Sequence, residues 1–170
     1  MGLSLSTDEQ ERGRMGKICT FFGHRDTYLD DEEKAQIRAC LINLIEKEGV
    51  DAFWFGSYGN FDSACAGITR SLKKEYPHIE MHLLLPYPTK NDRAGGASYD
   101  ELEFDSFSYF DPDKLLFPKF AISKRNDYMA KNCDFMICYV ICCWGGAFQA
   151  MQKAIRAKKT VFNFAPKRAF

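Results

Sequence analysis

The chain has 170 residues, of which 46% are hydrophobic, and its 23 lysines and arginines balance its 23 aspartates and glutamates. This length suits one domain with a sizeable core, and the balanced charge excludes a global positive field, so we expect neither nucleic acid nor a membrane as a partner. No run approaches the roughly 18 apolar residues of a membrane span, and the polar start lacks the apolar stretch of a secretion signal, so a cytoplasmic protein is expected.

The first predicted elements are a strand and a capped helix. After a polar tail at 1–16, expected to be flexible, residues 17–22 are an apolar segment of strand length. In the segment that follows, apolar residues recur at helical spacing. Asp30 and Glu33 match a capping box there, and Gly49 supplies the stop.

Two more strands, a helix and a long loop are predicted next. Residues 50–55 are a continuous apolar run, and a glycine-containing turn leads to a helical pattern over 61–72. Apolar residues alternate in 79–87, which predicts a third strand. Residues 86–118 are rich in proline and aromatic side chains, and a loop of this length is expected to be functional or mobile.

The C-terminal part of the chain predicts a helix, a strand, a helix and a strand, at 121–132, 134–141, 146–159 and 160–164. Strands that lack strict alternation and are separated by helices indicate a parallel sheet covered on both faces. We therefore predict an α/β fold, a doubly wound, mostly parallel five-stranded Rossmann-like sheet with helices on both faces. Residues 17–170 form this single domain.

Ligands of such sheets bind beyond the carboxyl ends of the strands, where the strand order reverses. At the end of the first strand, Gly23 allows a sharp turn, and His24 and Arg25 emerge where an anion or a base could be met. The structural alternative is a hydrogen-bonded histidine and a surface arginine.

The turn after the second strand, FGSYGNFDSA, is a second candidate site. Gly56 and Gly59 bracket a turn whose N–H groups, with the following helix N-terminus, form an anion site. Asp62 lies in the first turn of that helix and would cap it or accept a ribose hydroxyl. The spacing is GxxG, so the GxGxxG dinucleotide fingerprint is absent.

The stretch CWGGAF is a third candidate site. Gly145 and Gly146 let the backbone approach a ligand closely, and the helix that starts near Ala147 directs its partial positive end at the same space. Trp144 would stack on a base or fill core under the long loop. We favour a phosphate-binding turn over a bare turn.

A fourth candidate lies in the first turns of the helix after the long loop, where Ser123, Lys124, Arg125 and Asn126 follow one another. Arg125 is the best candidate for a bidentate phosphate contact. A solvated charged face is the alternative.

The seven cysteines are odd in number and lie mostly in apolar periodic segments, so we interpret them as small hydrophobic residues in a reducing compartment. Cys142 and Cys143 are included in this interpretation, as core of the preceding strand. Because the cysteines and histidines lack zinc-ligand spacing, no metal site and no cofactor are expected.

Together these segments resemble the SLOG superfamily, a Rossmann-like group that includes the LOG phosphoribohydrolases and the DprA-type proteins. The resemblance covers roughly residues 17–164. It is closest to small uncharacterised bacterial and phage proteins of the superfamily, through CTFFGHRD, GNFD, FAISKRN and WGGA. Since relatives are commonly dimers or larger, the resemblance implies self-association.

The match to LOG enzymes can be followed by residue. Their glycine-rich turn resembles 56–60, which implies ligand contacts at Ser57 and Asn60, and their arginine resembles Arg125, with Asn126 in place of a lysine. Their PGGxGTxxE motif is matched only at its double glycine.

The catalytic carboxylate of that LOG motif has no counterpart in this sequence. Met151 and Gln152 stand at the glutamate positions, where LOG enzymes carry the group that assists cleavage of the N-glycosidic bond. Asp62, Arg125 and Asp26 are the remaining candidates for a catalytic role.

The leading functional hypothesis is a sensor-like module that binds a nucleotide or another ribose-phosphate ligand. One alternative is a hydrolase of nucleoside monophosphates or NAD-like compounds at the glycosidic bond. Another is a protein-interaction or inhibitor module that uses the aromatic residues of 86–118.

Overall fold

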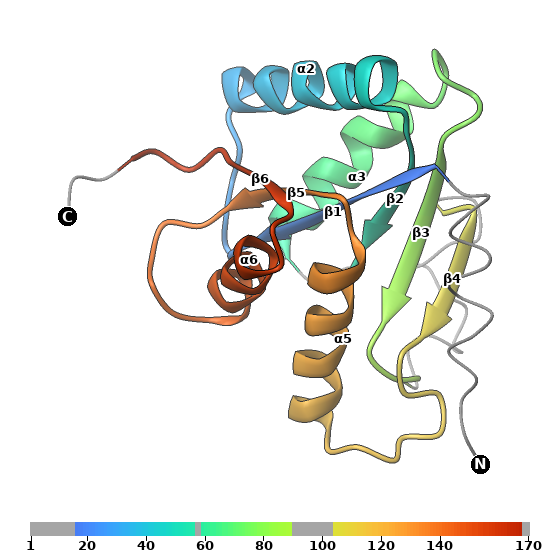
Figure 1. Ribbon diagram of the computed structural model, residues 1–170, viewed down its shortest axis with the longest axis vertical. Helices are drawn as coiled ribbons and strands as arrows, with labels where there is room; N and C mark the ends of the chain where they lie inside the picture. Colours follow the sequence, from blue (N-terminus) through green and yellow to red (C-terminus); the bar gives the residue numbers. More distant parts are fainter. Residues whose placement is uncertain (1–15, 57–58, 90–103, 168–170) are drawn as a thin grey trace.

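The computed structural model describes residues 16–56, 59–89 and 104–167, and the structural statements below refer to these ranges. Six parallel strands form one sheet in the order β4-β3-β2-β1-β5-β6 (Figure 1). The strands are β1 (Lys17–Gly23), β2 (Val50–Phe55), β3 (Glu80–Leu85), β4 (Ser106–Tyr109), β5 (Phe135–Tyr139) and β6 (Thr160–Asn163). The helices are α2 (Asp31–Glu48), α3 (Asn60–Leu72), α5 (Pro118–Asn132) and α6 (Gly146–Arg156). The tail predicted at 1–16 lies outside the described residues, apart from Gly16.

Helices cover both faces of the sheet, as Figure 1 shows, so the predicted doubly wound α/β architecture is confirmed. On one face, Ile37 and Leu41 of α2 and Phe61 of α3 pack with β-strand side chains in a buried cluster. On the other face, Met129 of α5 and Ala150 of α6 belong to a second cluster. Strands β1, β2, β3 and β5 therefore contribute buried apolar side chains to both clusters, which explains their near-continuous apolar runs in the sequence.

The sheet has six strands and not the five that were predicted. The additional strand, β4, lies within the predicted loop 86–118 and pairs in parallel with β3, with His82 opposite Ser106. It has four residues, SFSY, and they are half-buried or exposed. Such a short outer strand carries too few apolar residues to stand out from its surroundings, which is why the sequence pattern missed it.

The predicted start and end of the first helix are confirmed. The Asp30 side chain accepts a hydrogen bond from the Glu33 N–H at 2.7 Å, and the Glu33 carboxylate accepts one from the Asp30 N–H at 3.0 Å. Gly49 ends α2 in the left-handed region, with φ of 73°. These local bonds satisfy backbone groups that the helix itself leaves unpaired.

The strand predicted at 134–141 ends earlier, at Tyr139. The side-chain amide of Asn163 takes over there, because it accepts a bond from the Val140 N–H and donates one to the Val140 carbonyl, each at 3.0 Å. Cys142 and Cys143 therefore lie beyond the strand, half-buried and exposed. Their interpretation as strand core is wrong.

The order of strands places the topological switch point beside β1. From β1 the chain proceeds to β2, β3 and β4 on one side, and it returns to β5 and β6 on the other. The carboxyl ends of β1 and β5 are paired, but the segments that follow them lead to helices on opposite faces of the sheet. Ligands bind in the space between these segments in folds of this kind. Among the described residues, no helix is both long and apolar enough to cross a membrane.

Replacing Gly59 with alanine is expected to destabilise the protein by roughly 1–3 kcal/mol, because this residue has φ of 99° and a Cβ would lie 2.8 Å from the Arg25 backbone. Gly67, inside α3, has nothing within 4 Å of the same position, so Gly67→Ala is the matched control and should stabilise the fold by about 0.5–1 kcal/mol. Urea unfolding of both variants measures the difference. Equal stability of the two would refute the close approach of the two backbones.

Candidate functional site

A cavity of about 290 Å³ opens at the carboxyl edge of the sheet, at the switch point. It is lined by segments far apart in the sequence: the end of β1, the end of β2, and residues of α3, α5 and α6. The sequence-predicted residues that line it are Gly23, His24, Arg25, Gly56, Asp62, Arg125, Asn126, Gly146 and Ala147.

Other residues predicted for the site lie outside this lining. The cavity lining does not include Gly59, Asn60, Ser123, Trp144 or Gly145, and Ser57 lies outside the described residues. Three apolar lining residues were not predicted, namely Phe21, Phe22 and Ile122. Phe21 and Phe22 stand directly before Gly23, at the end of the apolar run, and this position is the sequence signal that could have identified them as lining residues.

The segment after β1 is fixed from two sides. The His24 N–H donates to the Tyr139 carbonyl of β5 at 3.3 Å, and the Arg25 carbonyl accepts from the Asn60 N–H at the start of α3 at 3.0 Å. This leaves the Arg25 side chain exposed at the cavity, without a hydrogen bond or ion pair to any residue that the structure describes. The backbone of Arg25 is thus fixed by hydrogen bonds, while its guanidinium has no partner among the described residues and can contact a ligand.

Arg125 has a different environment, since only 4% of it is exposed. Its Nη1 donates to the carbonyl of Gly56 at 2.8 Å and to that of Leu84 at 3.0 Å, and its Nε donates to Asn126 Oδ1 at 3.0 Å. The alternative of a solvated charged face is wrong for this residue. Arg125 connects α5 to the ends of β2 and β3, and a cation buried here adds positive potential beneath the cavity.

The start of α6 faces the same space. Gly145 is its N-cap residue, with φ of 89° and no side-chain capping bond, and the Gln149 N–H is bonded to the Gly145 carbonyl at 3.1 Å. The N–H groups of the first turn have no partner within the helix and carry its partial positive charge. Gly146 and Ala147 bring this end to the cavity, where a Cβ on Gly146 would lie 3.4 Å from Asn126 Nδ2.

Two side chains decide between alternatives left open by the sequence. Trp144 is 71% exposed, so it does not fill the core under a loop. Asp62 is buried in the first turn of α3. Among the described residues that line the cavity, it is the one that carries a carboxylate. Helix α6, GAFQAMQKAIR, holds no acidic residue at all.

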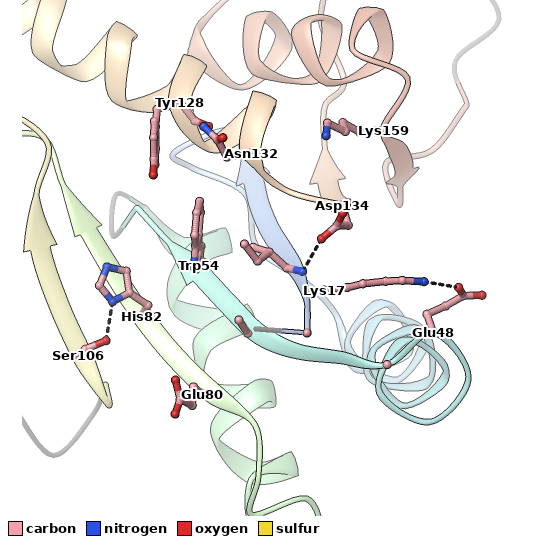
Figure 2. Close-up of a pocket in the computed structure, with 14 residues that line it drawn as sticks. Lys17, Glu48, Trp54, Glu80, His82, Ser106, Tyr128, Asn132, Asp134 and Lys159 are labelled. Carbon is pink, nitrogen blue, oxygen red and sulfur yellow. Dashed lines mark hydrogen bonds and ion pairs between the residues drawn. The ribbon is translucent and has the colours of Figure 1, made fainter. Parts of the chain in front are cut away.

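A larger cavity of about 680 Å³ lies toward the amino ends of the strands (Figure 2). Trp54 and Tyr128 stack there, with ring centroids 5.9 Å apart, and Lys17 forms an ion pair with Glu48 at 3.5 Å. Its charged lining is mainly acidic, with Glu48, Glu80 and Asp134 against two lysines, which disfavours an anionic ligand. The smaller cavity at the switch point is therefore the better candidate.

The described residues contain no cluster of three or more histidine, cysteine, aspartate or glutamate side chains that could hold a metal ion. Four cysteines are fully enclosed in the two cores: Cys19, Cys65, Cys133 and Cys138. Burial raises the pKa of each of these thiols, to about 12 for Cys133, so they remain protonated and behave as apolar residues.

Comparison with known proteins gives matches at the level of structure. No protein-family model matches the chain, and no curated protein does. Among solved structures, DNA processing protein A (DprA) from Streptococcus pneumoniae has 14% identity and a TM-score of 0.61, over 88% of this chain and 50% of that one. DprA from Helicobacter pylori has 18% identity and a TM-score of 0.59, over 91% and 67%. A structural-genomics target, TM1055, has 14% identity and a TM-score of 0.50, over 85% and 72%.

These matches confirm the predicted resemblance at the level of the fold, which is a Rossmann-type α/β fold similar to that of the two DprA structures. The chain spans half the length of the Streptococcus pneumoniae protein.

The expectation that nucleic acid is excluded as a partner is wrong. The Helicobacter pylori structure, which shares this fold, is described by its single-stranded DNA binding mode. The expectation came from the balanced net charge, but affinity for phosphates depends on where cations lie and not on their sum. Arg25 and the start of α6 provide local positive potential in a chain of zero net charge.

Replacing Arg125 with methionine is expected to cost about 2–5 kcal/mol of stability, because the carbonyls of Gly56 and Leu84 lose their donor inside the protein. The matched control is Lys124→Met, next to it on the exposed side of α5, which should change stability by less than about 0.5 kcal/mol. Denaturant unfolding measures both. A small effect of Arg125→Met would mean that this arginine does not hold the strand ends.

Proposed function

We propose that the cavity at the switch point binds the phosphate of a nucleotide or nucleotide-derived ligand, in a sensor-like role without cleavage. The observation that carries this proposal is the convergence of the exposed Arg25 guanidinium and the uncapped start of α6 on one cavity. Both favour negative charge. The α6 N–H groups and the Arg25 backbone are fixed before a ligand arrives, whereas the exposed Arg25 side chain becomes ordered on binding.

Asn126 completes the proposed phosphate contacts. Its Oδ1 accepts from Arg125, which orients the amide so that Nδ2 lies near Gly146 at the cavity. An amide N–H₂ donor there would bond a phosphate oxygen that the α6 N–H groups also contact. Gly146, having no side chain, leaves room for that oxygen.

The ribose and base would lie further out. Asp62 lines the cavity, and in this proposal its carboxylate would accept a ribose hydroxyl, the role suggested by the sequence. Trp144 and Tyr28 are highly exposed at the same edge and offer ring faces for a base.

Binding without cleavage is favoured by the absence of any carboxylate on α6. Hydrolysis of a glycosidic bond generally relies on a pair of carboxylates placed on either side of it. Instead of such a pair, the described residues that line the cavity include one carboxylate, that of Asp62, which is buried on α3.

Single-stranded DNA is a second candidate ligand, favoured by exposed apolar side chains at the carboxyl edge. Leu115 and Phe117 precede α5, Phe120 lies in its first turn, and Ile141 and Trp144 follow β5. Successive bases stack on aromatic side chains in single-strand binding proteins, and Phe117, Phe120 and Trp144 are aromatic. The comparison with DprA supports this candidate through the fold alone.

For the phosphate site, Arg25→Gln is expected to weaken binding of a nucleoside monophosphate by about 1.5–3 kcal/mol, because a charge-assisted bond is lost. Gly146→Ala should also weaken it, by placing a methyl group in the cavity, while Gly67→Ala in α3 serves as control and leaves affinity unchanged. Isothermal titration with the monophosphate and its nucleoside measures these effects. Equal affinity of wild type for the two ligands would contradict the proposal.

For the DNA candidate, Trp144→Ala is expected to weaken an oligothymidylate by about 1–3 kcal/mol, as one stacked base is lost. The matched control is Phe107→Ala, at an exposed aromatic on the outer strand β4. It should leave oligothymidylate binding unchanged, since β4 is separated from β1 by two strands. Fluorescence anisotropy at two salt concentrations measures both variants. Oligonucleotide binding that Trp144→Ala leaves intact would remove the carboxyl edge from this candidate function.

A further inference from the structure

A thiol and an imidazole meet beside the cavity, where β1 and β5 end. Cys142 Sγ lies 3.3 Å from His24 Nε2, although the two residues are 118 positions apart in the sequence. The contact is made between two loops that the sheet holds side by side, since His24 is bonded to Tyr139 and Ile141 of the β5 segment. The pair is therefore a product of the fold, and no local sequence spacing predicts it.

A backbone bond sets the form of this imidazole. The Ile141 N–H donates to His24 Nε2 at 3.2 Å, which requires a lone pair on Nε2 and leaves the ring proton on Nδ1. The Cys142 thiol shares this single lone pair with the Ile141 N–H, and its other nearby acceptor is the Trp144 carbonyl at 3.7 Å. An unprotonated ring nitrogen in contact with an S–H group is the arrangement of a base and a nucleophile.

The other thiols lack this arrangement. Cys19, Cys65, Cys133 and Cys138 are buried in the cores, and burial also raises the pKa of the half-buried Cys40 to about 11. Cys143 is exposed and has no histidine contact within the described residues. Cys142 thus combines access to solvent with a base at contact distance.

We propose that Cys142 and His24 form a thiol–imidazole pair that makes Cys142 a site of covalent modification by soft electrophiles. The pair shares His24 with the lining of the proposed phosphate cavity, but the proposal does not rest on the nucleotide function. Cys142 itself lines a neighbouring cavity of about 400 Å³ with Phe148 and Met151, whose apolar walls suit an electrophile with an apolar body.

Alkylation of Cys142 couples a proton transfer to the formation of an S–C bond. The Sγ proton passes to His24 Nε2, which gives up its bond from the Ile141 N–H, and the thiolate accepts a bond from the imidazolium. With iodoacetamide, an S–C bond forms at the methylene carbon, the C–I bond breaks, and iodide leaves with the electron pair. The imidazolium then returns its proton to solvent.

The test is the rate of alkylation of each cysteine in the folded full-length chain at neutral pH. Iodoacetamide is added for graded times, the reaction is quenched, and tandem mass spectrometry of the tryptic peptide 132–153 separates Cys142 from Cys143. Exposure alone predicts faster labelling of Cys143, whereas the pair predicts faster labelling of Cys142. We expect Cys142 to react about tenfold faster.

The role of His24 is tested with His24→Asn, for which the Cys142 rate should fall about tenfold while the Cys143 rate stays constant. Cys143→Ser is the matched control and should leave the Cys142 rate unchanged. Thermal unfolding of each variant verifies that it is folded at the labelling temperature. Faster labelling of Cys143 than Cys142 in the wild type would overturn the proposal, and so would a folded His24→Asn variant with an unchanged Cys142 rate.

Discussion

The buried guanidinium of Arg125 is the interaction on which the site depends. It extends from α5 beneath the cavity and donates to carbonyls at the ends of two neighbouring strands, β2 and β3. A charge in this position is costly to bury unless it is fully bonded, so the strand ends and the helix are held in one arrangement. Gly56 is part of this constraint, because a Cβ there would lie 2.9 Å from Arg125 Nη1. The guanidinium thus shapes the cavity, whereas Arg25, across from it, remains available to a ligand.

Much of the fold could be predicted because it is encoded locally. The capping box of α2, the stop at Gly49 and the apolar runs of β1, β2 and β5 depend on residues close in sequence. β4 could not be found in this way, because four half-exposed residues gain their strand conformation from pairing with β3. For the site, the segments that meet at the switch point followed from topology. The burial of Arg125 and the contact of His24 with Cys142 did not, since both depend on side chains that converge from distant parts of the chain.

The carboxyl edge combines features that are usually separated in a protein of neutral charge. Its centre is a small cavity of mixed polar and apolar lining, with positive potential from Arg25, Arg125 and the start of α6, and its rim carries exposed aromatic and aliphatic side chains. A free nucleotide would use the centre and one ring of the rim, whereas a strand of DNA would use several rings, with its phosphates near the positive centre. The same edge therefore offers contacts to both candidate ligands, and α6 carries no acidic residue there.

The distribution of buried cysteines has a consequence for following the motions of this protein. Cys19 and Cys65 lie in the cluster covered by α2 and α3, and Cys133 and Cys138 lie in the cluster covered by α5 and α6. A buried thiol becomes accessible only when its surroundings open, so each helical layer carries its own natural reporter of local unfolding. The opening of each layer can thus be measured separately by thiol labelling of the native chain, without an introduced cysteine.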